Sequence, residues 1–129
     1  MSKKNKRSSL IKKLDSIFSI YIRKSRSDKN GNTTCITCGK IEYWKNQDCG
    51  HFISRRNNST RWDERNVDTQ CKYCNRYCQG KQYEFSLKLG NKLSEELHIL
   101  SKQTVKLSDA DLEVMIEYYK NLVNNLEVK

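Results

Sequence analysis

The sequence has no proline, no long apolar run and no internal repeat. Without proline, no residue removes a backbone donor and breaks a helix from within. No apolar stretch approaches the roughly 20 residues that a membrane-spanning helix needs, so we expect a soluble protein with no membrane partner. The first residues are polar and basic, which argues against a secretory signal peptide and favours a reducing, cytoplasmic compartment.

Positive charge is what the chain has in excess. Of its 129 residues, 25 are Lys or Arg and 15 are Asp or Glu, which gives a formal net charge of +10. Such a surface attracts polyanions, and we expect DNA as the partner; a basic face that only meets solvent is the alternative. The candidate DNA-binding residues surround the central motifs: Arg55, Arg56, Arg61, Arg65, Lys72, Arg76 and Lys81.

Cysteine spacing is the most specific signal. Two Cys-x-x-Cys pairs lie far apart in the chain, and each can present two sulfurs to one tetrahedral ion. A reducing compartment favours thiolate–metal bonds over disulfides. We therefore predict a closed structural zinc site that compensates for a modest core, with the ligands Cys35, Cys38, Cys71 and Cys74. Cys49 and Cys78 are left as buried or incidental thiols, or alternatively as residues that exchange with the four.

The segment Asp48-Cys49-Gly50-His51 lies between the two cysteine pairs. Hydrolysis of a phosphodiester needs a base for water and a cation for the developing charge. His51 is the candidate base, and Asp48 is a hard ligand for a catalytic Mg²⁺ or Mn²⁺. Gly50 would let the backbone approach a phosphate or turn sharply. The alternative is a histidine with a purely structural role.

Two asparagines complete the candidate catalytic set. Asn75 directly follows the last predicted zinc thiolate, so the metal would fix its position and its amide could reach a divalent ion. The alternative for Asn75 is a cap for the helix that starts there. Asn66 is expected to bond backbone groups across a loop and so to hold His51 in place.

We predict an α+β fold with one domain over residues 1–129. Residues 1–8 would form a basic tail, and the apolar spacing of Leu10, Leu14, Ile17, Phe18 and Tyr21 predicts an amphipathic helix over 9–25. Residues 33–82 would form a zinc-braced core with short strands. Within that core, residues 54–65 are too polar for a strand or a buried helix and predict a long loop.

Residues 83–127 predict a helical region. Tyr83, Leu87 and Phe85 would belong to a helix that ends near Gly90, and Leu93, Leu97 and Leu100 share a face in the next one. Ser108 and Asp111 have the spacing of a capping box, which predicts the start of a C-terminal helix.

The order of the motifs resembles that of a known family. Cys-x-x-Cys-Gly, Asp-x-Gly-His, Glu-Arg-Asn, Cys-x-x-Cys-Asn and a following Gly80 occur as in the NinG/Rap family of phage recombination proteins, a branch of the HNH, or ββα-metal, nucleases. The resemblance runs from about Leu10 to Leu126. It implies a zinc-braced ββα-metal (HNH-like) core and a metal-dependent endonuclease that cuts branched recombination intermediates, such as Holliday junctions and D-loops, in a bacterial host cell.

The resemblance also implies roles for individual residues. His51 would be the general base, Asn75 a direct ligand of the catalytic metal, and the four paired cysteines the zinc ligands; Asp48 would bind the catalytic ion directly or through water. Tyr77 stands where a histidine occurs in the family. Cys49 stands where some related nucleases have an arginine, so a cation for the transition state would come from Arg55, Arg56 or Arg76.

Two other functions remain open at this point. One is an HNH nicking or homing-type endonuclease that acts on duplex DNA, and the other is a zinc-stabilised DNA-binding module without enzymatic activity. A resolvase normally needs two active sites. We therefore expect a homodimer, with the N- or C-terminal helix as its interface.

Overall fold

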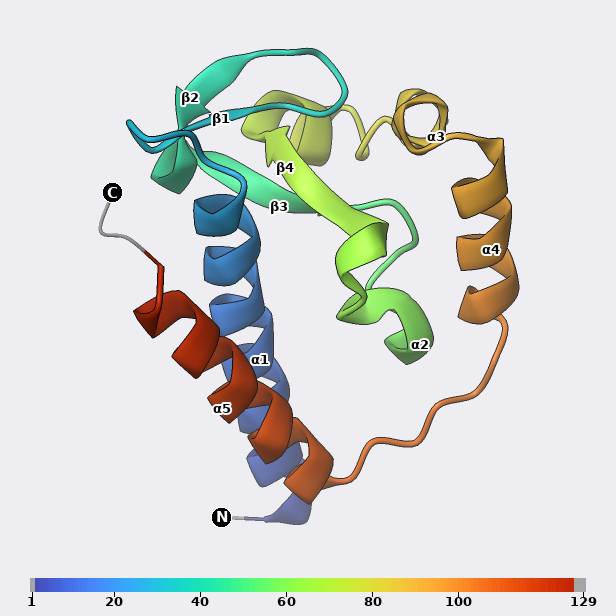
Figure 1. Cartoon of the computed structure of the whole chain (residues 1–129). Coiled ribbons are helices and arrows are strands. Elements are labelled where there is room, and N and C mark those ends of the chain that lie inside the picture. The colour runs from blue at the N-terminus through green and yellow to red at the C-terminus, as the bar shows by residue number, and fades with distance from the viewer. Residues whose placement is uncertain (1, 127–129) are drawn as a thin grey trace.

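A computed structural model describes residues 2–126. Figure 1 shows the long N-terminal helix α1 beside the C-terminal helix α5, with the strands at one end of this pair and α3 and α4 on the far side. The helices are α1 (Lys3–Ser25), α2 (Asn58–Arg61), α3 (Gln82–Leu89), α4 (Asn91–Ser101) and α5 (Asp109–Asn124). The strands are β1 (Asn32–Thr34), β2 (Ile41–Tyr43), β3 (Gln47–His51) and β4 (Val67–Cys71). Short helical turns are η1 (Trp44–Asn46), η2 (Glu64–Asn66) and the π-helical η3 (Tyr73–Tyr77).

Helices and small sheets thus occur together, as the sequence predicts. The strands form two separate antiparallel pairs, β1 with β2 and β3 with β4. In the second pair, Gln47 lies opposite Cys71 and His51 lies opposite Val67. This register places the end of the predicted catalytic motif at the start of β4. In residues 2–126, no helix combines the length and the apolar character needed to cross a membrane.

Helix α1 starts earlier than the sequence analysis predicts. The basic residues 3–8 are its first turns and not a tail, while Met1 lies outside the described residues. The Ser2 hydroxyl caps the helix by accepting from the Asn5 amide at 3.2 Å. Arg7 fixes the same end by donating to the Leu107 carbonyl at 2.7 Å. A helix cap and a tertiary contact therefore order a segment that charge alone marks as solvated.

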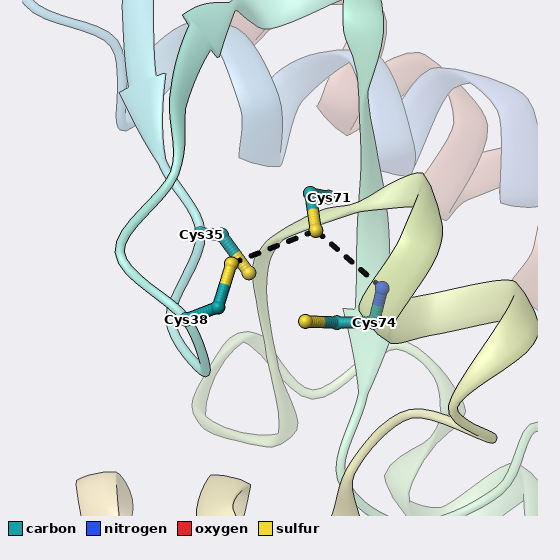
Figure 2. Close-up of side chains that lie close together, drawn as sticks. All are labelled: Cys35, Cys38, Cys71 and Cys74. Atoms are coloured by element: carbon teal, nitrogen blue, oxygen red, sulfur yellow. Dashed lines mark hydrogen bonds between the residues drawn. The ribbon is translucent and has the colours of Figure 1, made fainter.

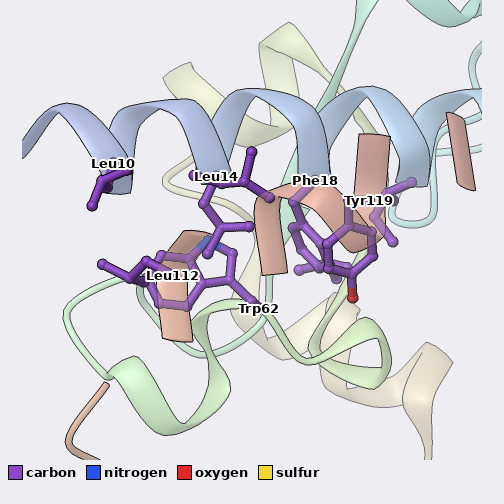
Figure 3. Close-up of a cluster of buried hydrophobic side chains, with 9 residues drawn as sticks. Leu10, Leu14, Phe18, Trp62, Leu112 and Tyr119 are labelled. Atoms are coloured by element: carbon purple, nitrogen blue, oxygen red, sulfur yellow. The ribbon is translucent and has the colours of Figure 1, made fainter. Parts of the chain in front are cut away.

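The main hydrophobic core lies between α1 and α5. The predicted stripe of α1 buries Leu10, Leu14, Phe18 and Ile22. Figure 3 shows this face against side chains of α5 and the indole of Trp62. The rings of Phe18 and Tyr119 meet edge to face with centroids 5.0 Å apart. This core fixes α1, one face of which also contacts β3.

The capping box of α5 is confirmed. The Ser108 hydroxyl accepts from the Asp111 amide at 3.0 Å, and the Asp111 carboxylate accepts from the Ser108 amide at 2.9 Å. The apolar positions that follow then turn toward α1, where Leu112, Ile116 and Tyr119 are buried. The predicted C-terminal helix is confirmed because its cap and its apolar periodicity agree.

A second core lies around α3 and α4. Helix α3 ends at Gly90, as predicted, and Gly90 has a φ of +89° that favours glycine. The buried residue of α3 is Phe85, whereas Tyr83 and Leu87 are 72% and 60% exposed. The predicted helix and its end are therefore confirmed, and Phe85 marks its inner face. Leu97 of α4 is fully buried and packs in a cluster with Phe85.

The segment 54–65 is not a continuous loop. It contains α2 and leads into η2, where the Asp63 carboxylate caps the turn by accepting from the Arg65 amide at 2.9 Å. Trp62 anchors the segment, because its ring is buried and its indole N–H donates to Asp15 Oδ1 at 3.0 Å. One buried aromatic side chain thus orders a stretch whose composition is otherwise polar.

Candidate metal centre and adjoining cleft

The four predicted zinc ligands come together. The turn between β1 and β2 carries Cys35 and Cys38, Cys71 ends β4, and Cys74 lies in η3. Their Sγ atoms all lie within 4.8 Å of one another, and Figure 2 shows the four side chains gathered around one point. Cys38 Sγ and Cys71 Sγ are 3.7 Å apart. A tetrahedral ion with Zn–S bonds of about 2.3 Å would need an edge of about 3.8 Å.

The surroundings of the thiols fit a metal ion such as zinc. The Cys74 amide points at Cys71 Sγ at 3.4 Å, and the Thr37 hydroxyl lies 3.4 Å from Cys35 Sγ. Burial raises the pKa of Cys35, but hydrogen bonds from Thr37 and from backbone amides outweigh it and lower the pKa to about 6. All four cysteines are free of disulfides. Four thiolates would fill a tetrahedral shell, so such an ion would stabilise the fold and leave no position for substrate.

The other two cysteines stay outside this cluster. Cys49 packs against the core between α1 and α5, and burial raises its pKa to about 12. It is therefore a neutral thiol at physiological pH. Cys78 is half-buried just after η3, where its amide donates to the Tyr73 carbonyl at 3.0 Å. Both positions agree with the prediction of ordinary, unligated thiols.

A cleft of about 700 Å³ adjoins the metal centre. Strand β3 forms one wall, one face of α1 forms another, and the segment that follows Cys71 forms the third. The residues that line it are Asp15, Phe18, Ser19, Arg23, Lys45, Gln47, Asp48, Cys49, His51, Arg55, Lys72, Asn75, Arg76, Gln79, Gly80 and Gln82. Three of the four predicted catalytic residues, namely Asp48, His51 and Asn75, therefore share one cleft.

Asp48 and Asn75 are in direct contact. The Asn75 amide group donates to Asp48 Oδ2 at 3.0 Å. Arg76 donates to both oxygens of the same carboxylate at 2.9 Å, so the charge of Asp48 is neutralised within the protein. Asn75 lies inside η3, whose N-cap is Lys72, and so it does not cap a helix. Carboxylate and amide oxygens, such as those of Asp48 and Asn75, are the ligand type that Mg²⁺ prefers. An ion could reach Asp48 only if Arg76 moved aside.

His51 is held by its backbone surroundings. Its Nε2 lies 2.9 Å from the Arg61 carbonyl oxygen, which can only accept, so Nε2 carries the proton and Nδ1 is left as an acceptor. Burial lowers the pKa of His51, and the bond to Arg61 only partly opposes this effect. The imidazole is therefore neutral at physiological pH, the state that a general base requires.

Asn66 does not line the cleft, but it has the supporting contacts that the sequence analysis predicts. Its side chain is fully buried and accepts from the Ile53 amide at 2.8 Å. It also donates to the carbonyls of Ile53 and Thr60, both at 3.0 Å. These bonds close the loop that follows His51 and bring Arg61 to its imidazole. Asn66 is thus a positioning residue.

The predicted DNA-binding residues divide into two groups. Arg55, Lys72 and Arg76 line the cleft, whereas Arg56, Arg65 and Lys81 do not. Arg61 is also outside it and forms an ion pair with Asp15 at 2.6 Å. The sequence analysis missed Arg23 and Lys45, which line the cleft from α1 and η1. Arg23 lies 5.2 Å from the Trp44 ring centre, and burial lowers its pKa.

Gly50 lies within strand β3, so it does not make the sharp turn that is one of its two predicted roles. A Cβ at this position would lie 2.8 Å from the Gln70 Cβ, so glycine is needed for close packing between the strands. Buried Gln70 then donates to the Gly80 carbonyl at 2.8 Å. This bond holds a turn in which Gln79 and Lys81 have the unusual positive φ values of 54° and 45°. The turn delivers Gln82, which donates to the His51 carbonyl at 3.2 Å.

Fold and site together define a small protein of mixed helices and sheets, with a four-thiol candidate metal centre beside a basic cleft. The family model described as Bacteriophage Lambda NinG protein matches residues 1–128, and the chain belongs to this NinG family of bacteriophage proteins. Searches of curated proteins and of solved structures found no match. The family predicted from the order of the motifs is thereby confirmed.

Proposed function

We propose that the protein is a metal-dependent endonuclease that cuts branched DNA intermediates of recombination, such as Holliday junctions and D-loops. The observation that carries the proposal is the cleft in which neutral His51 lies with Asp48 and Asn75, beside the four-thiol cluster and among five cationic side chains. The order of β3, β4 and η3 also agrees with the two strands and following helix of an HNH, or ββα-metal, core.

His51 is the general base of the proposed reaction. Because Nε2 donates to the Arg61 carbonyl, Nδ1 takes the proton from a water molecule, whose oxygen then attacks phosphorus. The bond from phosphorus to the 3′ oxygen breaks and the 3′ oxygen takes a proton from solvent, which leaves a 5′-phosphate and a 3′-hydroxyl. A Mg²⁺ or Mn²⁺ ion held by Asp48 and Asn75 would supply positive charge for a non-bridging oxygen and for the leaving oxygen.

The other cleft residues bind and orient the DNA backbone. Arg23, Lys45, Arg55 and Lys72 place positive charge around the three catalytic side chains, where phosphates would displace counterions. Arg23 is the best fixed of these cations, since its Nε donates to the Ser19 hydroxyl at 3.0 Å. It replaces Arg56 among the candidates for transition-state stabilisation, because Arg56 does not line the cleft.

Preference for branched DNA follows from the way in which the cleft would read its substrate. Cations contact phosphates and carry no sequence information. No base-reading helix is recognisable beyond the zinc region, so we infer that selectivity comes from the shape of the DNA. A resolvase cuts two strands, and we therefore propose a homodimer that acts in the cytoplasm of the host. Sedimentation of the chain with and without a four-way junction would test the dimer.

The substrate experiment compares a four-way junction and a D-loop with a linear duplex of the same sequence, with Mg²⁺ or Mn²⁺ at moderate salt. We expect cleavage of the branched substrates in preference to the duplex, and none without the divalent ion. Equal cleavage of all three, or cleavage at a single duplex sequence, would instead favour the nicking or homing-type alternative.

A DNA-binding module without activity is the second alternative, and one observation favours it. The carboxylate of Asp48 is already satisfied by Arg76 and Asn75. If the protein binds DNA but never cleaves it at any divalent-ion concentration, this pairing is permanent and the module is the correct function.

A further inference from the structure

Two exposed tyrosines project from η3, the turn that also carries a zinc-ligand candidate and Asn75. Tyr73 is 64% exposed and Tyr77 is 80% exposed. Their ring centroids lie 6.3 Å apart and their planes differ by only 28°. The two rings therefore present faces that point in nearly the same direction, as the bases of a nucleic acid strand do.

These rings contribute little to the core. Neither Tyr73 nor Tyr77 belongs to a hydrophobic cluster in the described part of the chain, and neither lines the cleft. Tyr77 stands where a histidine occurs in the family, but it does not line the cleft that contains Asp48. Neither core packing nor the cleft therefore explains why two large rings are exposed on η3.

The neighbouring side chains indicate which ligand the rings would meet. Lys72, the N-cap of η3, and Arg76 each precede one of the two tyrosines by one residue, and both line the cleft. Lys72 thus offers a charge for phosphates, while the two tyrosines beside it offer aromatic faces for bases. This combination of a basic track and stacking rings is how proteins hold unpaired nucleic acid strands.

We propose that Tyr73 and Tyr77 form a stacking platform for unpaired or unstacked bases at the branch point of the DNA. The inference rests on the proposed function and deepens it, because it names the feature of the substrate that the protein recognises. A continuous duplex keeps its bases stacked on one another and offers nothing to the platform. A junction, a D-loop or a gap exposes base faces next to the scissile strand.

The test measures binding and not cleavage, so that it is independent of the catalytic proposal. Dissociation constants are determined without added Mg²⁺ for a DNA with unpaired bases at the branch point, and for the same DNA with abasic sites at those positions. The wild-type protein should bind the first DNA more tightly. Tyr73→Ala and Tyr77→Ala should each weaken that binding on the order of 5- to 100-fold and remove the preference over abasic DNA.

Three further variants separate stacking from other effects. Tyr77→Phe keeps the ring and should keep the preference. Tyr118→Ala removes a tyrosine of similar exposure, 54%, from α5 and should change nothing. Lys72→Ala should weaken binding to both DNAs by the same factor, because it acts on phosphates.

The outcomes distinguish this inference from the proposed function. A base preference that depends on the tyrosines supports the platform even if the protein never cleaves DNA. Two results would overturn the platform: both alanine variants bind the DNA as tightly as the wild type, or the wild type binds the abasic DNA as tightly as the DNA with unpaired bases. If the protein still cleaves junctions in either case, the nuclease proposal stays intact. Thermal unfolding of each variant should match that of the wild type.

Discussion

The four-thiol cluster and the neighbouring cleft differ in whether a side chain of the protein neutralises their negative groups. In the cluster, the Sγ atoms of four cysteines lie within 4.8 Å of one another. In the cleft, Arg76 pairs with both oxygens of Asp48. Four thiolates this close together would need an external cation, whereas the carboxylate of Asp48 is already neutralised by Arg76. An ion such as zinc could thus bind the cluster without displacing a side chain, whereas an ion at Asp48 would have to compete with Arg76.

Loss of the cluster should have the largest effect. The protein should contain about one zinc ion per chain, and Cys74→Ser should release it and unfold the central region, since structural zinc contributes about 10–16 kcal/mol in zinc-finger peptides. Metal analysis and circular dichroism would measure both results. Cys78→Ser is the matched control and should keep the zinc. A protein without zinc, or with Cys35 in a disulfide, would contradict the prediction.

The packing that joins the two regions comes next. Gly50→Ala places a methyl group against the Gln70 side chain, which links Thr37 of the cysteine turn to Gly80 beside the cleft. Overpacking of this kind should destabilise the protein by about 1–3 kcal/mol, as measured by urea unfolding. Thr34→Ala, at an exposed strand position, should cost much less. Equal stability of the two variants would show that Gln70 can move away freely.

The pH dependence of cleavage should show the titration of His51 in the cleft. Burial lowers the pKa of His51, so the imidazole stays neutral until the pH falls below the usual value of about 6.5. The rate should be constant with respect to this group near pH 7–8 and should fall about tenfold per pH unit once the pH is below the lowered pKa. A limb of this kind with a pKa above about 7 would mean that another group is the base.

Competition for Asp48 should give the smallest effect. Arg76→Gln removes the side chain that occupies the carboxylate, so the Mg²⁺ concentration for half-maximal cleavage should fall a few-fold. Asn75→Ala removes a proposed ligand and should raise that concentration. Lys88→Gln, at an exposed position outside the cleft, should leave it unchanged. A higher Mg²⁺ requirement in Arg76→Gln would show that the arginine assists metal binding.

Features that depend on a few neighbouring residues could be predicted from the sequence, whereas features that depend on tertiary contacts could not. The four-cysteine cluster is expected from two short spacings, and the start of α5 from a cap and a periodic stripe, so both could be predicted without the fold. The inner face of α3 could not, because eight residues give too few apolar positions to set the phase. The start of α1 could not be predicted, because a charged segment by itself suggests a solvated tail. The Ser2 cap and the contact of Arg7 with Leu107 that order it are visible only in the structure.

The cleft shows the same division. Asp48, His51 and Asn75 belong to recognisable motifs, whereas Arg23 and Lys45 come from elements that carry no motif and reach the cleft only through tertiary packing. The link from Gly50 through Gln70 to the turn at Gly80 also depends on strand register, which the sequence does not state. Positive charge in a sequence therefore suggests a class of partner, but the fold decides which charged side chains line the same cleft.

The role of the cleft can be tested with the two histidines of the chain, His51 and His98. His51→Ala and His98→Ala would be compared with the wild type for the rate of cleavage of a four-way junction, with zinc content and junction binding measured in parallel. His98 is exposed on α4 and does not line the cleft. We expect His51→Ala to lose at least about 100-fold in rate while it keeps zinc and DNA binding, and His98→Ala to cleave normally. Full activity in His51→Ala would contradict the proposed mechanism.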